Sequence, residues 1–118
     1  MKFLIADDSK VARKRVLTIL DELNYAVVGE ATNGLDAVEK FKELNPTVVI
    51  IDLEMPNLKG NEASKMILEI DPNVDIILIT SSNDKKEILN AFNIGIKKVI
   101  RKPFTKELLE QTINELKG

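Results

Sequence analysis

TVVIIDLEMP, residues 47–56, is the stretch from which the fold of this chain can be inferred. Its β-branched run stops at Asp52, and Met55-Pro56 ends the segment soon afterwards. A continuous run of this kind predicts a strand that is buried on both faces, as in an interior parallel strand between helices. In open α/β sheets, ligands bind beyond the carboxyl ends of the strands. Asp52 is therefore a candidate site residue.

Similar runs lie on both sides of this stretch and alternate with segments whose apolar residues have helical spacing. We expect strands at residues 2–6, 25–30, 47–52, 74–80 and 97–101. Side chains suited to capping helices precede the intervening segments, and they are Ser9, Asn33, Asp84 and Thr105. In the fourth helix we expect an inner face made of Ile88, Leu89 and Phe92.

This alternation predicts an α/β fold, in which a five-stranded parallel sheet and five helices form a doubly wound, flavodoxin-like, three-layer sandwich. Right-handed crossovers and burial of the most apolar strands favour the strand order 2-1-3-4-5. Because no linker or low-complexity tract divides the chain, we expect residues 1–118 to form a single domain.

Composition restricts the chemistry of the chain. It has no cysteine and no histidine, which excludes disulfides, thiolate catalysis and the commonest transition-metal ligand. A net charge of −2 with mixed signs indicates neither a nucleic-acid surface nor a membrane surface. The N-terminal apolar run is too short for a signal peptide, and no stretch reaches the ~20 apolar residues of a membrane span. We therefore expect a cytoplasmic protein, in which oxygen ligands hold any metal.

Acidic residues follow two strands that are neighbours in the predicted order. Because such strands lie about 4.8 Å apart, Asp7, Asp8 and Asp52 should meet at one edge of the sheet. Three adjacent carboxylates repel one another, and Mg²⁺ is a hard cation that prefers oxygen ligands. The sequence therefore predicts a magnesium site at this edge.

The other two strand ends add hydroxyl groups and a cation. Thr80 and Ser81 end the fourth strand, and Lys102 follows the fifth. This set suits phosphoryl transfer to a carboxylate, with Asp52 as nucleophile and a phosphohistidine of a partner as a possible donor. Singly, each residue is also explained as a helix cap, a turn residue or a solvated lysine. Independent capping, however, gives no reason for all of them to lie at the carboxyl ends of strands.

Together these motifs resemble the receiver domains of two-component response regulators, the CheY-like family. The motifs are Asp7-Asp8, Asp52 with Met55-Pro56 and Gly60, Thr80-Ser81, and Lys102-Pro103-Phe104. The resemblance spans the whole chain in order and spacing. It implies a stand-alone receiver in which Asp52 is the phosphoacceptor.

The resemblance also implies two sets of site residues. The set that would hold Mg²⁺ comprises Asp7, Asp8, Asp52 and the backbone carbonyl of Glu54, with Asp7 acting mainly through a bound water. The set that would bind the phosphoryl group and act as the switch comprises Thr80, Ser81 and Lys102. A cis peptide bond is expected between Lys102 and Pro103.

Partners follow from the same resemblance. It implies a histidine kinase or a histidine phosphotransfer protein as donor, and a downstream protein that docks on the face formed by the fourth helix, the fifth strand and the fifth helix. The expected docking residues are Lys86, Lys97, Val99 and Arg101. Dispersed, solvated lysines explain the same charges equally well. We expect a monomer that binds neither nucleic acid nor membrane and signals by docking or onward phosphotransfer, as in chemotaxis or a phosphorelay.

Two positions depart from the family pattern. Val99 stands where the family usually has Tyr or Phe, so coupling would either run through the fourth helix and the loop before it or be weak. Glu54 adds a carboxylate close to where attacking water would approach, which bears on the rate of dephosphorylation.

Other function classes are weaker. A phosphorylation-independent interaction module of the same fold is disfavoured because the acids and Lys102 are intact. An aspartyl-phosphate phosphatase of the haloacid dehalogenase type would have a second aspartate where this chain has Glu54. Flavin binding would need a phosphate-cradling loop where the chain has Asp7 and Asp8.

Overall fold

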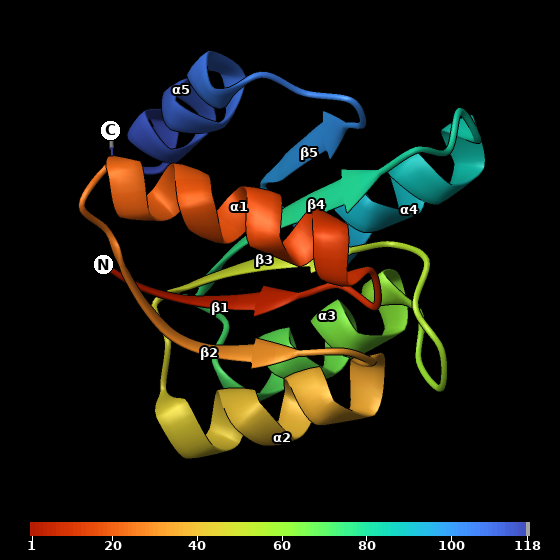
Figure 1. Cartoon of the computed structure of the whole chain (residues 1–118). Helices are drawn as coiled ribbons and strands as arrows, with labels where there is room; N and C mark the ends of the chain where they lie inside the picture. The colour runs from red at the N-terminus through yellow and green to blue at the C-terminus, as the bar shows by residue number, and fades with distance from the viewer. Residues whose placement is uncertain (118) are drawn as a thin grey trace.

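The computed structural model describes residues 1–117 and contains one sheet of five parallel strands in the order β2-β1-β3-β4-β5 (Figure 1). The strands are β1 (Lys2–Ala6), β2 (Ala26–Ala31), β3 (Val48–Asp52), β4 (Asp75–Thr80) and β5 (Lys98–Arg101). The predicted fold class and strand order are confirmed, and each strand boundary lies within one residue of its expected position.

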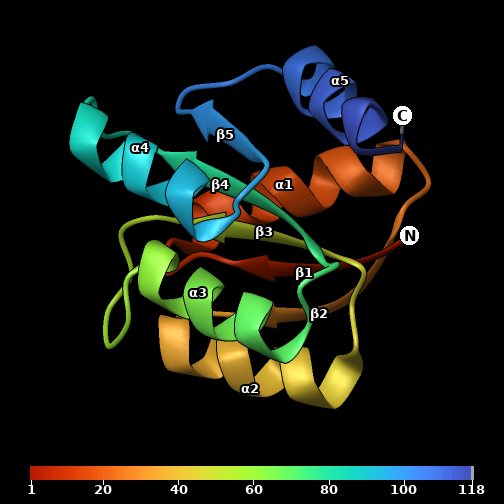
Figure 2. The same cartoon turned by 180° about the vertical axis from the view of Figure 1, so that it is seen from behind.

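Four helices connect these strands within the described residues, and a fifth follows β5. They are α1 (Lys10–Glu22), α2 (Gly34–Leu44), α3 (Gly60–Ile70), α4 (Lys85–Ile94) and α5 (Lys106–Lys117). Helices α1 and α5 cover one face of the sheet, and α2, α3 and α4 cover the other (Figures 1 and 2). Within residues 1–117, no helix combines the length and the apolar character that crossing a membrane requires.

The core consists of two apolar layers, one on each face of the sheet. Strand β3 contributes to both, because Val48 and Ile50 pack on the side of α1 and α5, whereas Val49 and Ile51 pack on the side of α2 and α3. All five residues of β3 are buried. The prediction of an interior strand buried on both faces is thus confirmed, and Asp52 is carried on the most enclosed strand of the sheet.

Helix starts follow the capping residues read from the sequence. Ser9, Asn33, Asp84 and Thr105 each accept a hydrogen bond from a backbone N–H in the first turn that follows, at 2.8 to 3.2 Å. These bonds satisfy donors that a helix leaves unpaired at its N-terminus. The capping bonds of Ser9 and Asp84 therefore help to fix the chain where it leaves the carboxyl ends of β1 and β4.

The predicted inner face of α4 is wrong. Leu89 and Phe92 are 61% and 47% exposed, Ile88 is half-buried, and Ala91 is the residue of α4 that is buried. A small side chain lets the helix lie close to the sheet, and Ile96, just beyond the helix, provides apolar burial instead. Periodicity alone cannot distinguish these rotations of the helix, because both place apolar residues at helical spacing.

Helix α4 is also joined to α3 by a buried amide. The side-chain nitrogen of Asn61 donates a hydrogen bond to the backbone oxygen of Glu87 at 3.1 Å. The amide oxygen of Asn61 and the hydroxyl of Ser64 are buried without a hydrogen-bond partner. An unpaired buried polar atom costs about 1–3 kcal/mol, so the unpaired oxygen of Asn61 offsets part of what its hydrogen bond to α4 contributes.

Candidate functional site

The predicted acidic cluster forms where β1 and β3 end. These strands pair in parallel with Ala6 opposite Ile51, so the next residues, Asp7 and Asp52, lie side by side. Carboxylate oxygens of Asp7, Asp8 and Asp52 all lie within 4.8 Å of one another. Asp7 and Asp52 are buried, whereas Asp8 is exposed. The structure therefore brings together the three acids that the sequence placed at this edge.

Asp7 is held in place by its own loop and by α1. One carboxylate oxygen of Asp7 accepts a hydrogen bond from the backbone N–H of Ser9 at 2.9 Å. The backbone N–H of Asp7 donates to the backbone oxygen of Ala31 at 3.0 Å. Arg13 donates from Nη1 to the backbone oxygen of Asp7 at 2.8 Å and pairs through Nε with Glu30 at 3.2 Å. These bonds tie the acidic loop to the end of β2.

Sequence reasoning missed this role of Arg13, and no local signal could have found it. Four cations stand in the first turns of α1, and they are Lys10, Arg13, Lys14 and Arg15. The sequence does not show which of them reaches the backbone oxygen of Asp7 and the carboxylate of Glu30.

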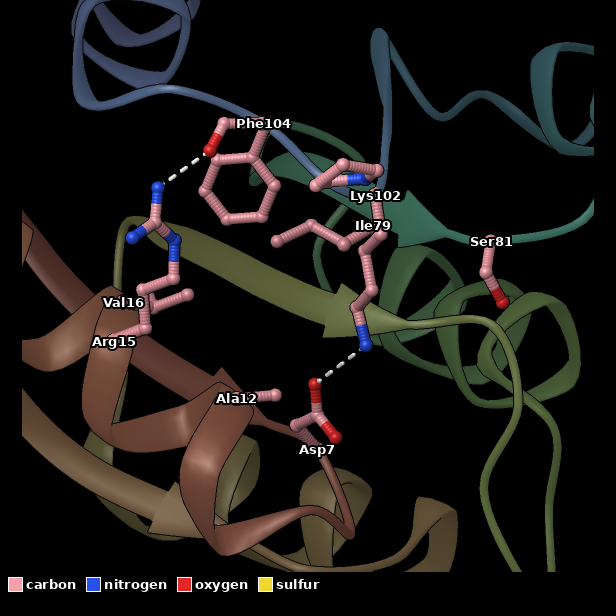
Figure 3. Close-up of a pocket in the computed structure, with 9 residues that line it drawn as sticks. Asp7, Ala12, Arg15, Val16, Ile79, Ser81, Lys102 and Phe104 are labelled. Atoms are coloured by element: carbon pink, nitrogen blue, oxygen red, sulfur yellow. Dashed lines mark hydrogen bonds and ion pairs between the residues drawn. The ribbon is translucent and has the colours of Figure 1, made fainter.

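Lys102 reaches the acids from the end of β5. Its Nζ lies 3.2 Å from an oxygen of Asp7 and 3.2 Å from an oxygen of Asp52 (Figure 3 shows the pair with Asp7). Its backbone N–H donates to the oxygen of Thr80 at 2.8 Å, which extends the β4–β5 pairing to this point. The peptide bond between Lys102 and Pro103 is cis, as expected. One ammonium group therefore bridges two carboxylates that come from different strands.

Burial and crowding change the ionisation of the cluster. Burial raises the pKa of Asp52 to about 6, and the charge of Asp7 acts in the same direction, more strongly than that of Asp8, while Lys102 opposes both. Burial alone would lower the pKa of Lys102, but the charges of Asp52 and Asp7 outweigh it and raise that pKa above its usual value. The site is short of positive charge, and its hard oxygen donors fit a divalent cation such as Mg²⁺.

The hydroxyl residues at the end of β4 differ in their surroundings. Thr80 is fully buried, and its hydroxyl oxygen accepts a hydrogen bond from the backbone N–H of Ser82 at 2.9 Å. Ser81 is exposed and lines the same pocket as Lys102 (Figure 3). Thr80 is therefore linked directly to the loop that leads into α4.

Gly60 allows the loop after β3 to turn beneath Asp52. Its N–H donates to the oxygen of Leu53 at 2.8 Å, and a Cβ placed on it would lie 2.4 Å from the backbone oxygen of Asp52. Any larger residue would displace the backbone that carries the acid. Glu54 lies exposed in the same loop, in the bend that follows β3.

A family model for the response regulator receiver domain matches residues 3–114 of this chain. The chain belongs to the response regulator receiver domain family. The receiver domain is 38% identical over 115 residues to the chemotaxis protein CheY of Thermotoga maritima, an alignment that covers 98% of this chain and 96% of the relative. It is 36% identical over 114 residues to CheY of Bacillus subtilis, with 97% and 95% covered.

Solved structures agree with this receiver domain in fold. A crystal structure of the CheX–CheY–BeF3–Mg complex from Borrelia burgdorferi has a TM-score of 0.95 at 26% identity, covering 100% of this chain and 90% of that chain. The response regulator domain of Thermotoga maritima CheB has a TM-score of 0.87 at 34% identity, covering 100% and 97%. The chain is thus a CheY-like receiver domain of two-component signalling.

The expected docking residues of the receiver domain lie around α4 and β5. Lys86 and Arg101 are exposed, and Val99 is half-buried against the apolar layer beneath α2, α3 and α4. Lys97, however, pairs with Asp75 at 2.6 Å. The idea of dispersed lysines that serve ordinary surface contacts therefore has support at this position.

A pocket that the sequence did not indicate adjoins the acids of the receiver domain. It has a volume of about 380 Å³ and lies between α1 and the segment that follows β5 (Figure 3). Arg15 closes one side, because its Nη2 donates to the backbone oxygen of Phe104 at 2.6 Å and its guanidinium lies 5.5 Å from the centre of the Phe104 ring. Arg15 and Phe104 are 89 positions apart in the sequence, so no local pattern could reveal the pocket between them.

Proposed function

We propose that this receiver domain is a phosphoacceptor switch, in which Asp52 accepts a phosphoryl group from a histidine kinase or a histidine phosphotransfer protein in a magnesium-dependent reaction. The observation that carries the proposal is the acidic cluster with its bridging lysine. Asp52 lies within 4.8 Å of Asp7 and Asp8, and Lys102 spans Asp7 and Asp52 at 3.2 Å each. This arrangement supplies a nucleophile, a metal-binding set and a fixed cation in one place.

Asp52 has the properties that a nucleophilic carboxylate needs. With a pKa of about 6 it is ionised above neutral pH, and it retains more basicity than an ordinary aspartate. One oxygen is paired with Lys102, which leaves the other to attack phosphorus. In the transfer, the new bond forms between this oxygen and phosphorus while the phosphorus–nitrogen bond of the donor breaks. The imidazole, which is protonated on its other ring nitrogen, takes the electron pair and leaves as a neutral base.

The neighbouring residues would stabilise the charge that moves with the phosphoryl group. Mg²⁺, held by Asp8, Asp52 and the backbone carbonyl of Glu54 with Asp7 close by, would neutralise phosphoryl oxygens. In the proposed mechanism, Lys102 moves from bridging two carboxylates to bridging Asp52 and the phosphate. That exchange is favourable because a phosphoryl group carries more negative charge than the Asp7 carboxylate, which it replaces as a partner of Lys102.

We propose that the signal leaves through α4, β5 and α5. In support, Thr80 is hydrogen-bonded to the loop before α4, and the apolar side chains of Leu89 and Phe92 are exposed on that helix. When the hydroxyl of Thr80 turns to a phosphoryl oxygen, its bond to Ser82 is lost and the loop is free to move. With Val99 in place of an aromatic residue, this loop is the proposed route to the docking residues Lys86, Lys97, Val99 and Arg101.

The function can be tested by mass. Wild type, Asp52→Asn and Glu54→Gln are incubated with Mg²⁺ and acetyl phosphate, and intact mass is measured. We expect one phosphoryl adduct in wild type and in Glu54→Gln but none in Asp52→Asn, and we expect chelation of Mg²⁺ to abolish it. No adduct in wild type at any Mg²⁺ concentration, or an equal adduct in Asp52→Asn, would refute the proposal.

A further inference from the structure

Arg13 joins the acidic loop to the neighbouring strand through two contacts of one guanidinium. Its Nη1 donates to the backbone oxygen of Asp7 at 2.8 Å, and its Nε pairs with Glu30, in β2, at 3.2 Å. The side chain of Arg13 is only 14% exposed, so the protein around it restrains its rotamer. A planar guanidinium with fixed donor directions holds two such partners in one geometry. Arg13 therefore sets the position of the acidic loop relative to β2.

The contact with Asp7 bears directly on the direction of Asp8. The carbonyl of Asp7 lies in the peptide plane that connects the two residues, so a hydrogen bond to its oxygen fixes the plane from which Asp8 starts. The carboxylate of Asp7 is already bound by the backbone N–H of Ser9 at 2.9 Å and by Lys102 at 3.2 Å. Asp8 is exposed, so packing does not hold its side chain. The direction of Asp8 thus depends on the peptide plane that Arg13 holds.

Glu30 offsets the charge that Arg13 brings close to the acids. A cation beside carboxylates weakens their attraction for a metal ion, and an ion pair with a carboxylate reduces that effect. Glu30 is held in turn by Lys40, whose Nζ donates to the backbone oxygen of Glu30 and pairs with Asp36 at 3.2 Å. The hydrogen bond to Asp7 can therefore orient the loop at a small electrostatic cost to cation binding.

We propose that Arg13 is a positioning residue for the metal site, and that it raises the affinity for Mg²⁺ by holding Asp8 in the direction in which it binds. The inference rests on the proposed function and adds to it a residue outside the acidic cluster. Ligands that are already oriented lose less conformational freedom on binding. Groups that orient metal ligands typically contribute about 10- to 100-fold in affinity. Because Arg13 acts through a backbone oxygen, we place its contribution near the lower end, at roughly tenfold.

A purely electrostatic effect of Arg13 would have the opposite sign. Removing a cation near three carboxylates makes the cluster more negative, which by charge alone would tighten the binding of Mg²⁺. Removing a positioning contact loosens Asp8 and weakens the binding. A contact that only stabilises the fold would change the melting temperature and leave the Kd unchanged. The direction of the change in Kd therefore separates these three roles.

The test measures Mg²⁺ binding to wild type, Arg13→Gln and Lys14→Gln. Magnesium chloride is titrated into each protein, and the Kd is obtained from the amide resonances of residues 7–10. The two variants lose the same charge from neighbouring positions of α1, but Lys14 is exposed. We expect Arg13→Gln to raise the Kd roughly tenfold and Lys14→Gln to leave it close to the wild-type value.

A third variant keeps the charge and changes only the geometry. In Arg13→Lys a single ammonium group replaces the guanidinium, so the two contacts cannot be made in the same arrangement. We expect the Kd for Mg²⁺ to exceed the wild-type value in this variant too, although the net charge of the protein is unchanged. Thermal unfolding in EDTA establishes that each variant is folded, and Arg13→Lys carries the comparison if Arg13→Gln does not fold.

A second measurement does not need the metal. Backbone order parameters are obtained by ¹⁵N relaxation in EDTA for the same proteins. We expect the amide of Asp8 to be as rigid in wild type and Lys14→Gln as ordered backbone, with an order parameter of about 0.85, and to fall toward about 0.6 in Arg13→Gln.

The outcomes separate this inference from the function on which it rests. A Kd that decreases or does not change in Arg13→Gln, or an amide of Asp8 that stays rigid in that variant, would overturn the positioning role. If wild type still binds Mg²⁺ and forms the acetyl phosphate adduct, the proposed function of Asp52 stands. A wild type that binds no Mg²⁺ at any concentration would overturn both.

Discussion

Replacing Asp52 by asparagine is expected to make the magnesium-free protein more stable. Asp52 is 6% exposed, and its carboxylate shares the cluster with Asp7 and Asp8. Burial, followed by the charge of Asp7, raises its pKa from 3.8 to about 6. Above that pH, the folded protein must hold a charge that the unfolded chain carries at no cost. Asparagine keeps the shape of the side chain and removes the charge.

The size of the effect follows from the pKa. Because the folded state binds the proton more tightly than the unfolded state, the stability contributed by this carboxyl is present below a pH of 3.8 and is lost as the pH rises through about 6. At 1.36 kcal/mol for each unit of pKa, the loss amounts to roughly 3 kcal/mol. For a domain of this size, regaining that energy corresponds to a melting temperature roughly 10 °C higher.

Thermal unfolding in EDTA, followed by circular dichroism, measures this difference. Wild type, Asp52→Asn and Glu69→Gln are compared from about pH 8 down to about pH 4. We expect Asp52→Asn to melt well above wild type at the upper end, and the gap to shrink as the pH falls. Glu69 is exposed on α3, so the control should follow wild type throughout. A hundredfold excess of Mg²⁺ over Kd should stabilise wild type by about 2.7 kcal/mol, and it should stabilise Asp52→Asn by less.

The reasoning has a clear point of failure. If wild type and Asp52→Asn keep the same difference in melting temperature at every pH, the carboxyl of Asp52 is not perturbed by its surroundings. If the variant is the less stable protein above neutral pH, the pairing with Lys102 outweighs the burial and repulsion that we infer.

Three further changes test the structure around the site. Gly60→Ala should destabilise the protein by more than about 2 kcal/mol in urea unfolding, because the new Cβ would lie 2.4 Å from the backbone oxygen of Asp52. In the control variant Gly29→Ala, the new Cβ meets the end of a leucine side chain, so the loss of stability should be clearly smaller. Ser9→Ala removes the cap of α1 and should cost about 1 kcal/mol in the same assay. Asn61→Leu loses a hydrogen bond to α4 but also removes an unpaired buried oxygen, so the free energy of unfolding should change little. Amide exchange in the first turns of α4 should become faster, because the bond that holds this end of the helix is gone. Unchanged exchange would show that the bond does not anchor the helix.

The fold could be read from the sequence because its signals are local. Runs of β-branched residues such as that before Asp52 define strands, and caps such as Ser9 and Asn33 define helix starts. The rotation of α4 could not be predicted in the same way. It depends on how closely Ala91 approaches the sheet, and that distance is set by packing rather than by the spacing of apolar residues.

The candidate site was predictable to the extent that it depends on topology. Parallel strands that end at one edge bring Asp7 and Asp52 together whatever the details of the loops. The contacts of Arg13 and Arg15 were not predictable, because each depends on the exact seating of α1 over loops from other strands. The pairing of Lys97 with Asp75 was missed for another reason, because it depends on the register between β5 and its neighbour β4.

The contact between Lys102 and Asp7 also bears on how the protein folds. The two residues are 95 positions apart, and Lys102 follows an edge strand that is the last of the five along the chain. A nascent chain can pair β1 with β3, and so bring Asp7 beside Asp52, before β5 has left the ribosome. Until then the acids oppose that pairing. Docking of β5 therefore completes both the sheet and its charge balance, which couples the final long-range step of folding to assembly of the site.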